Sequence, residues 1–133
     1  MVVRDALLEA VRVLVVDDDP RVRSALRAFL LAAAHVDVVG VADSATTAVD
    51  IANQERPTVA LVDILLPEAA EGLTVVRVLA DSMRIPVVAT SMDSSLRSTA
   101  IAAGARGFLS KDSAPDLLLA TLREAAARDG QHR

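Results

Sequence analysis

Charged residues that could do chemistry follow three of the apolar runs in this sequence. Asp17 and Asp18 come directly after the first run, Asp63 ends a later one, and Lys111 follows the last. Lys111 is the chain's single lysine, against thirteen arginines. If these runs are parallel strands, their carboxyl ends meet at one edge of the sheet. The spacing therefore predicts that the acids and the lysine converge on one pocket.

The acids in this pocket predict a magnesium site. Neighbouring carboxylates repel one another unless a cation lies between them, and an all-oxygen ligand set suits Mg²⁺. Asp17, Asp18 and Asp63 are the expected ligands, and the backbone carbonyl of Leu65 could provide a further one. Asp19 is better explained as the N-cap of the helix that follows.

Asp63 is also a plausible nucleophile toward phosphorus. Beside a metal that neutralises phosphoryl oxygens, a carboxylate can form an acyl phosphate. Lys111 would place a compact positive charge on a phosphoryl oxygen. A hydroxyl at the end of the fourth apolar run, from Thr90 or Ser91, could bind another phosphoryl oxygen; Ser91 could instead cap the next helix.

Composition limits the class of protein. The chain has 133 residues, of which 53% are hydrophobic, and its aromatic residues are Phe29 and Phe108. This length indicates one domain with a core of aliphatic residues. A net charge of −4 argues against nucleic-acid binding by this domain. Charged residues within the first sixteen exclude a signal peptide or membrane span there, and the lack of cysteine fits a cytoplasmic protein.

Alternating strands and helices predict the fold. The expected strands are Arg12–Asp17, Val36–Ala42, Thr58–Asp63, Pro86–Thr90 and Arg106–Ser110. The expected helices are Pro20–Ala34, Ser44–Asn53, Leu73–Met83, Asp93–Ala103 and Ser113–Ala127. Asp19 and Pro20 begin the first of these helices, and Gly104 ends the fourth. The last helix begins with a capping-box-like pair, Ser113 and Asp116. This α/β pattern predicts a doubly wound parallel sheet. We expect a leader over residues 1–10, a domain over 11–128 and a tail over 129–133.

Three motifs together resemble the receiver domain of bacterial two-component response regulators. They are Leu14-Val15-Val16-Asp17-Asp18-Asp19-Pro20, Leu61-Val62-Asp63-Ile64-Leu65-Leu66-Pro67 and Gly104-Ala105-Arg106-Gly107-Phe108-Leu109-Ser110-Lys111-Asp112. The resemblance implies a flavodoxin-like (βα)5 sandwich with strand order 2-1-3-4-5. The pair Lys111-Asp112 is similar to the subfamily that carries a C-terminal helix-turn-helix output domain.

The resemblance also implies a role for each residue of the pocket. Asp63 would be phosphorylated by a sensor histidine kinase, in a reaction that needs Mg²⁺ held by Asp17, Asp18, Asp63 and the Leu65 carbonyl. Lys111 would pair with the phosphoryl group. Thr90, with Ser91 as the alternate, would be the switch hydroxyl, and Phe108 the switch aromatic.

The expected output is a signalling surface rather than enzymatic turnover of a separate substrate. Residues 93–127 would form a partner or homodimer face, and phosphorylation would control transcription through an output domain or partner; such an output domain could be missing from this chain.

Two departures from the usual receiver pattern fall in segments that are expected to be mobile. Gly72 lies nine residues after Asp63, one more than is usual, and the stretch from Thr90 to Gly104 is one residue shorter than usual.

Three alternatives stay open at this point. A haloacid-dehalogenase-like phosphatase also uses a strand-end aspartate with Mg²⁺, but it needs a second acid where Leu65 stands. A flavodoxin-like small-ligand module would need a phosphate-binding loop where Asp17 and the following acids would repel phosphate. A receiver used only for protein interaction would not need the complete set of acids and lysine.

Overall fold

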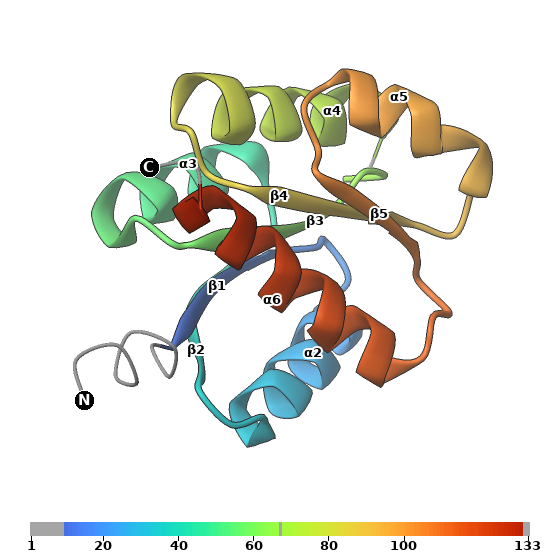
Figure 1. Ribbon diagram of the computed structural model, residues 1–133. Coiled ribbons are helices and arrows are strands. Elements are labelled where there is room, and N and C mark those ends of the chain that lie inside the picture. The colour runs from blue at the N-terminus through green and yellow to red at the C-terminus, as the bar shows by residue number, and fades with distance from the viewer. Residues whose placement is uncertain (1–9, 67, 132–133) are drawn as a thin grey trace.

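A parallel five-stranded sheet forms the centre of the protein. In the computed structural model, which describes residues 10–66 and 68–131, the strands are β1 (Val11–Val16), β2 (Val36–Ala42), β3 (Val59–Asp63), β4 (Val87–Ser91) and β5 (Gly107–Ser110). They lie in the order β2-β1-β3-β4-β5, and every neighbouring pair is parallel (Figure 1). The predicted flavodoxin-like sheet and its strand order are confirmed.

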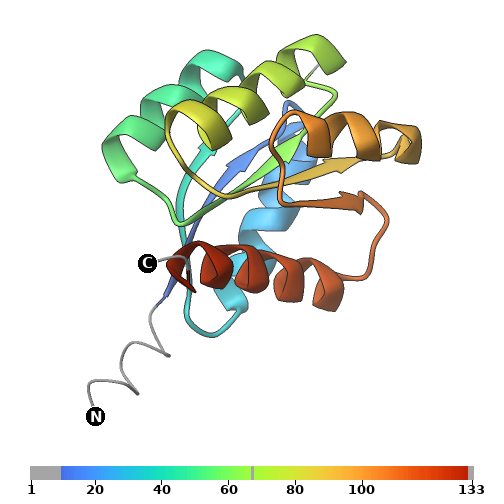
Figure 2. The same ribbon diagram turned by 45° about the horizontal axis from the view of Figure 1, so that its top comes forward.

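Helices cover both faces of the sheet. They are α2 (Pro20–Ala32), α3 (Ala45–Glu55), α4 (Ala69–Arg77) with its π-helical continuation η1 (Val78–Ser82), the short 3₁₀ turn η2 (Ser94–Leu96), α5 (Arg97–Ala102) and α6 (Pro115–Gln131). Helices α2 and α6 pack on one face, and α3, α4 and α5 pack on the other (Figures 1 and 2). No helix in the described ranges is both long and apolar enough to cross a bilayer.

The sheet separates two apolar cores because successive strand residues point to opposite faces. On β3, Ala60 and Val62 join the core beneath α3, α4 and α5, whereas Val59 and Leu61 join the core beneath α2 and α6. All four side chains are almost fully buried. The purely apolar stretch of β3 before Asp63 is thus explained by burial on both faces.

Two of the three helix-end features predicted from the sequence are found in the structure. The Asp19 side chain accepts a hydrogen bond from the Arg21 N–H, with Pro20 in the first helical position, as predicted. Gly104 follows α5 with a φ of 118°, which a residue with a side chain rarely adopts. The predicted capping box at Ser113 is wrong. Helix α6 begins at Pro115, and its first bonds are accepted by the Ala114 carbonyl, because a proline fits the first helical position.

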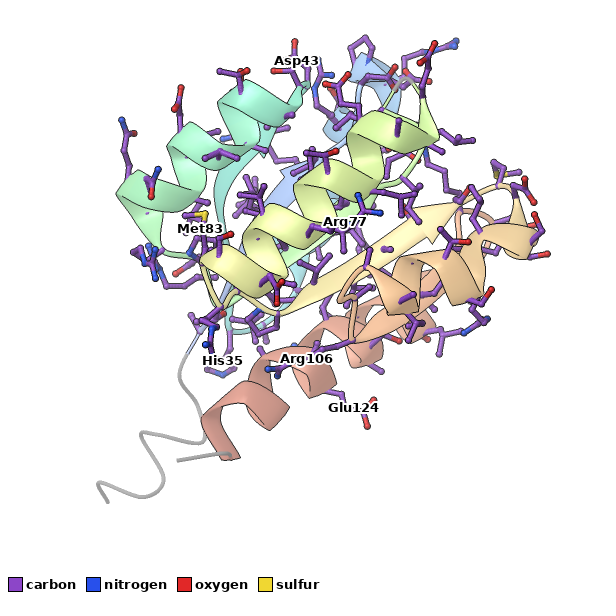
Figure 3. The ribbon with its side chains drawn as sticks, turned by 90° about the horizontal axis from the view of Figure 1, so that it is seen from above. His35, Asp43, Arg77, Met83, Arg106 and Glu124 are labelled. Carbon is purple, nitrogen blue, oxygen red and sulfur yellow. The ribbon has the colours of Figure 1, made fainter. Side chains whose placement is uncertain are left out.

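The helix expected over residues 73–83 is longer and less regular. It begins at Ala69 and ends in a π-helical turn, in which the Met83 N–H bonds to the Val78 carbonyl five residues earlier. Met83 lies beside the end of α3, where its carbonyl accepts a hydrogen bond from Arg56 (Figure 3).

The last helix also extends beyond its expected end and includes residues 129–131. The expected leader lies mostly outside the described residues.

The loop after β3 is packed directly against α4. A Cβ atom on Gly72 would lie 1.7 Å from the Ile64 carbonyl oxygen, so only glycine allows this helix to approach the backbone that follows Asp63. Within the loop, the Leu66 N–H bonds to the Ile64 carbonyl two residues earlier, a tight γ-turn-like arrangement.

Candidate functional site

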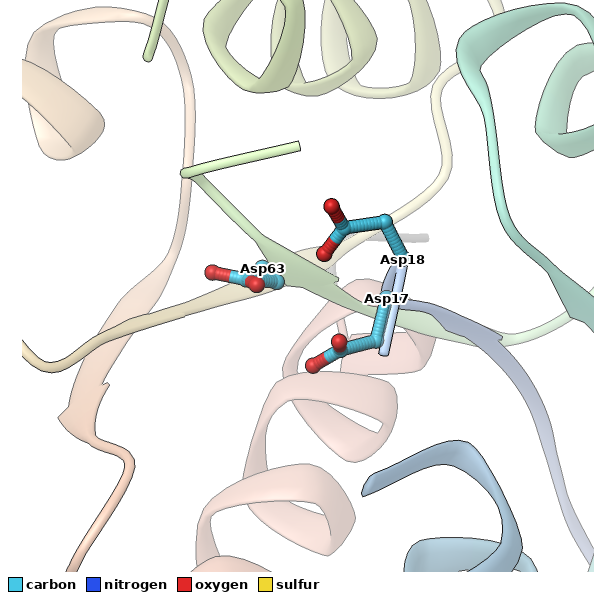
Figure 4. A group of neighbouring side chains, drawn as sticks. All are labelled: Asp17, Asp18 and Asp63. Carbon is cyan, nitrogen blue, oxygen red and sulfur yellow. The ribbon is translucent and has the colours of Figure 1, made fainter. Parts of the chain in front are cut away.

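Three carboxylates meet at the carboxyl edge of the sheet. Asp17 and Asp18 follow β1, and Asp63 ends the neighbouring strand β3 (Figure 4). One carboxylate oxygen from each lies within 4.8 Å of the others. Asp17 and Asp63 are buried, and Asp18 is exposed. The predicted convergence follows from the parallel pairing of β1 with β3, which brings their ends together.

Lys111 connects two of these carboxylates. Its Nζ lies 2.9 Å from Asp17 Oδ2 and 3.0 Å from Asp63 Oδ2, and its side chain is only 19% exposed. Burial alone would lower the pKa of Lys111, but the hydrogen bonds to Asp17 and Asp63 outweigh it, so the pKa is raised. The lysine is therefore a permanent cation placed between a metal-ligand candidate and the nucleophile candidate.

Backbone groups hold both buried carboxylates in place. The Leu65 N–H donates to Asp63 Oδ1 at 3.1 Å, and the Asp19 N–H donates to Asp17 Oδ1 at 2.9 Å. Arg23 of α2 donates to the Asp17 carbonyl at 2.8 Å, which ties the end of β1 to the first turns of the helix. Each carboxylate is thus preorganised by a turn in its own chain segment.

Asp63 is the acid whose charge the fold disfavours. Burial raises its pKa above the ordinary value of 3.8, and the nearby Asp17 adds to this, while Lys111 and the Leu65 N–H act in the opposite direction. An ionised Asp63 is therefore held at a cost in free energy. Side chains with a shifted pKa are common at sites where they take part in a reaction.

The donor set fits a hard divalent cation. All three side chains offer carboxylate oxygens, the ligands that Mg²⁺ prefers. The exposed Asp18 carboxylate has no hydrogen bond or ion pair with another residue in the described part of the chain, so its ligand atoms are available. A cation here would also reduce the repulsion between Asp17 and Asp63. The Leu65 backbone folds back toward Asp63, and a metal bond from its carbonyl stays a prediction.

Thr90 and Ser91, the two candidate hydroxyls, lie on opposite faces of the sheet. Side chains alternate between the two faces along β4. Ser91 therefore points to the same face as Val87 and Ala89, which lie in the core that contains Phe108. Thr90 points to the same face as Val88, which lies in the core beneath α2 and α6. Both are buried, at 8% and 0% exposed respectively. The Ser91 hydroxyl accepts a hydrogen bond from the Asp93 N–H at 3.0 Å.

Phe108 already lies inside the protein. Its side chain is 4% exposed in the core beneath α5, and the Arg97 guanidinium lies over its ring at 5.1 Å from the centroid. The side chain that the resemblance implies as the switch aromatic therefore occupies an inward position in this structure. The ring faces the same side of the sheet as Ser91, not Thr90.

Two site neighbours were not predicted from the sequence. Arg23 and Arg97 both lie on helices among several other arginines, and nothing in their spacing distinguishes them. Arg23 reaches the site because α2 starts immediately after the acid pair. Arg97 reaches Phe108 because it begins α5, which packs against β5.

Comparisons with known proteins agree with this geometry. The family model described as response regulator receiver domain matches residues 13–123. The chain is 32% identical over 121 residues to the nitrate/nitrite response regulator protein NarL of Escherichia coli strain K12, covering 90% of this chain and 56% of that protein. It is 33% identical over 124 residues to a probable transcriptional regulatory protein NarL of Mycobacterium tuberculosis. The chain thus spans little more than half the length of these relatives.

Solved structures show the same fold. The signal receiver domain of the putative response regulator NarL from Mycobacterium tuberculosis superposes with a TM-score of 0.81 at 30% identity, covering 90% of this chain and 98% of that one. The receiver domain of a modulated diguanylate cyclase from Desulfovibrio desulfuricans G20 gives a TM-score of 0.83 at 29% identity, covering 94% and 100%. With the strand order, the acid cluster and the family match in agreement, this chain belongs to the receiver domains of two-component response regulators and has their phosphoacceptor signalling role.

Proposed function

We propose that Asp63 accepts a phosphoryl group from a sensor histidine kinase in a Mg²⁺-dependent reaction. The observation that carries this proposal is the position of the Lys111 ammonium, 3.0 Å from Asp63 Oδ2 and 2.9 Å from Asp17 Oδ2. A nucleophilic carboxylate, a fixed cation and two further acids then surround the space that a phosphoryl group would enter. Phosphoryl transfer depends mainly on such positioning and charge stabilisation.

The chemistry assigns a separate task to each side chain. A carboxylate oxygen of Asp63 forms an O–P bond as the N–P bond of the donor histidine breaks, and the histidine leaves with the bonding electrons. Lys111 stabilises a phosphoryl oxygen. Asp17, Asp18 and Asp63 would hold Mg²⁺, whose charge offsets that of the phosphoryl oxygens. The protein would thereby assist its own phosphorylation and dephosphorylation without turning over another substrate.

We keep Thr90 as the proposed switch hydroxyl, with Ser91 as the alternate. Thr90 pairs directly with Asp63 in the register of β3 with β4. Both residues have the strand phase of the core beneath α2 and α6, which contains Leu61 and Val88. Ser91 has the opposite phase, on the Phe108 side of the sheet, and its hydroxyl accepts a hydrogen bond from the Asp93 N–H.

The signal would leave through the surface built from α5, β5 and α6. Residues 93–127 mix apolar side chains, such as Ile101 at 45% exposed and Leu117 at 51%, with charged ones. Such a blend suits a partner or a second copy of the chain. Control of transcription through an output domain or partner, in the cytoplasm, is proposed by analogy with relatives named as transcriptional regulators.

Intact-mass spectrometry after treatment with acetyl phosphate and Mg²⁺ tests the proposal. We expect one added phosphoryl group, labile to base, in the wild type and in the exposed-acid control Asp50→Asn, and none in Asp63→Asn. EDTA or Asp18→Ala should reduce the rate by orders of magnitude, because repulsion between the carboxylates and the donor is then not offset. A phosphoryl group retained in Asp63→Asn, or metal-independent phosphorylation, would contradict the assignment.

A phosphatase of the haloacid-dehalogenase type is the alternative enzyme class. It would need an acid two residues after the nucleophile, and that position holds Leu65, an apolar side chain that is 37% exposed. Hydrolysis of p-nitrophenyl phosphate at catalytic turnover would support the alternative. A receiver that never becomes phosphorylated would instead leave the mass unchanged with every phosphodonor.

A further inference from the structure

We propose that Arg23 is a positioning residue for the metal-binding acids, although it is not itself a ligand. Arg23 lies in the first turn of α2, and its guanidinium donates a hydrogen bond to the backbone carbonyl of Asp17 at 2.8 Å. Asp17 and Asp18 are two of the three carboxylates at the candidate Mg²⁺ site (Figure 4). The inference deepens the proposed function, since it concerns how the same site holds its metal.

The carbonyl that Arg23 bonds belongs to the peptide that links Asp17 to Asp18. A peptide unit is planar, so a bond that fixes the Asp17 carbonyl also fixes the direction in which the chain enters Asp18. Strand β1 ends at Val16, and the Asp17 N–H makes a last bond to the Ala42 carbonyl at the end of β2, at 3.0 Å. Arg23 thus restrains the carbonyl of Asp17 as the sheet restrains its N–H.

Asp18 depends on this backbone restraint more than the other two acids do. Asp17 is buried, and its carboxylate accepts bonds from the Asp19 N–H and from Lys111, each at 2.9 Å. Lys111 also bonds the buried Asp63 carboxylate. Asp18 is exposed, and among the described residues its carboxylate has no such partner. The course of the backbone is therefore what places an Asp18 oxygen within 4.8 Å of the other two carboxylates.

The charge of Arg23 separates positioning from a purely electrostatic role. A guanidinium beside a cation site repels the cation, so charge alone predicts that removing Arg23 strengthens Mg²⁺ binding. Positioning predicts the opposite result, because a ligand that is free to move must be ordered when the metal binds, and this ordering costs free energy. The two effects have opposite signs, so the direction of the change in Mg²⁺ affinity identifies the one that dominates.

The test is isothermal titration calorimetry of Mg²⁺ into the full, metal-free chain without a phosphodonor. We expect Arg23→Met to weaken Mg²⁺ binding about tenfold, the low end of the loss that follows removal of an outer partner of a metal ligand. Arg23→Lys keeps a donor and a charge, so its affinity should lie between those of Arg23→Met and wild type. Arg27→Met is the matched control, because Arg27 is exposed one turn further along α2. It should leave Mg²⁺ binding unchanged or slightly stronger.

The metal dependence of phosphorylation gives a second readout. With acetyl phosphate, the Mg²⁺ concentration at half the maximal rate should rise in Arg23→Met by the same factor as the dissociation constant. The rate at saturating Mg²⁺ should change less, because Asp63 and Lys111 keep their own bonds. Arginine, lysine and methionine have similar helix propensities, so the substitutions preserve α2. The amide spectrum in EDTA shows that each variant is folded, and Arg23→Gln replaces Arg23→Met if the latter is not.

Two results would overturn the proposal. They are Mg²⁺ binding by folded Arg23→Met that equals or exceeds that of wild type, and an equal loss of affinity in Arg27→Met. Because the titration contains no phosphodonor, either result leaves the assignment of Asp63 as phosphoacceptor unaffected. A phosphoryl group retained in Asp63→Asn would contradict that assignment instead, and would leave the measured Mg²⁺ affinities as they are.

Discussion

The guanidinium of Arg97 lies over the ring of Phe108, 5.1 Å from its centroid, and covers the aromatic side chain that β5 presents to α5. The arginine is exposed while the ring is 4% exposed, so the pair closes the core at this surface. An arginine in this geometry is attracted to the face of the ring. The contact therefore favours the inward position of Phe108 before any phosphoryl group arrives.

The Arg97–Phe108 contact should be measurable as a coupling energy. In a double-mutant cycle with Arg97→Gln and Phe108→Leu, we expect about 0.5–1 kcal/mol of coupling in urea unfolding followed by circular dichroism. Arg97→Lys should keep part of it. Additive effects of the two substitutions would mean that the contact contributes nothing to the position of the ring.

Asp63→Asn should make the metal-free protein more stable at neutral pH. Because burial raises the pKa of Asp63 above 3.8, ionised Asp63 destabilises the folded state, and asparagine removes this charge. We expect a gain of about 1 kcal/mol, the usual size of a stabilising substitution. The gain should disappear as the pH falls through the raised pKa to below 3.8, where the wild-type carboxyl is protonated in both states.

The measurement is urea unfolding in EDTA at pH 7 and at the lowest pH at which the wild type remains folded. Asp50→Asn, on the exposed face of α3, is the matched control and should show no such pH-dependent gain. A destabilised Asp63→Asn at pH 7 would show that the bond from Lys111 outweighs the burial of the charge.

Gly72→Ala should disrupt the loop that carries the phosphoacceptor. The added Cβ would lie 1.7 Å from the Ile64 carbonyl oxygen, so either α4 or the backbone after Asp63 must move. We expect a loss of about 2–3 kcal/mol in the free energy of unfolding and slower phosphorylation. Gly107→Ala is the control, since its Cβ would meet a Thr121 methyl at 3.3 Å, and it should cost less than about 1 kcal/mol. Equal losses in the two variants would refute this account of Gly72.

Ser91→Ala and Thr90→Val should separate the two candidate hydroxyls. With beryllofluoride and Mg²⁺, we expect Thr90→Val to abolish most of the NMR shift changes in residues 93–110, because the hydroxyl that lies opposite Asp63 is lost. Ser91→Ala should retain them. The reverse pattern would make Ser91 the switch residue.

The sequence by itself determined the architecture. The sequence alternates apolar runs, each of the length of a strand, with segments of helical periodicity. This alternation predicts a doubly wound sheet. Parallel pairing then places Asp17, Asp63 and Lys111 at one edge, whatever the details of the loops. For this reason the acid cluster and the bridging lysine could be predicted, apart from their distances.

Only the tertiary structure decided which face each neighbouring side chain occupies. Thr90 and Ser91 are adjacent, polar and at a strand end, and a shift of one residue in strand phase exchanges their faces. The phase is set by the pairing of β4 with β3 and β5, which is a long-range contact that no local pattern encodes. The positions of Arg97 over Phe108 and of Gly72 against Ile64 have the same origin. They depend on how separate elements pack, because close packing in the core is decided by shape across the whole fold.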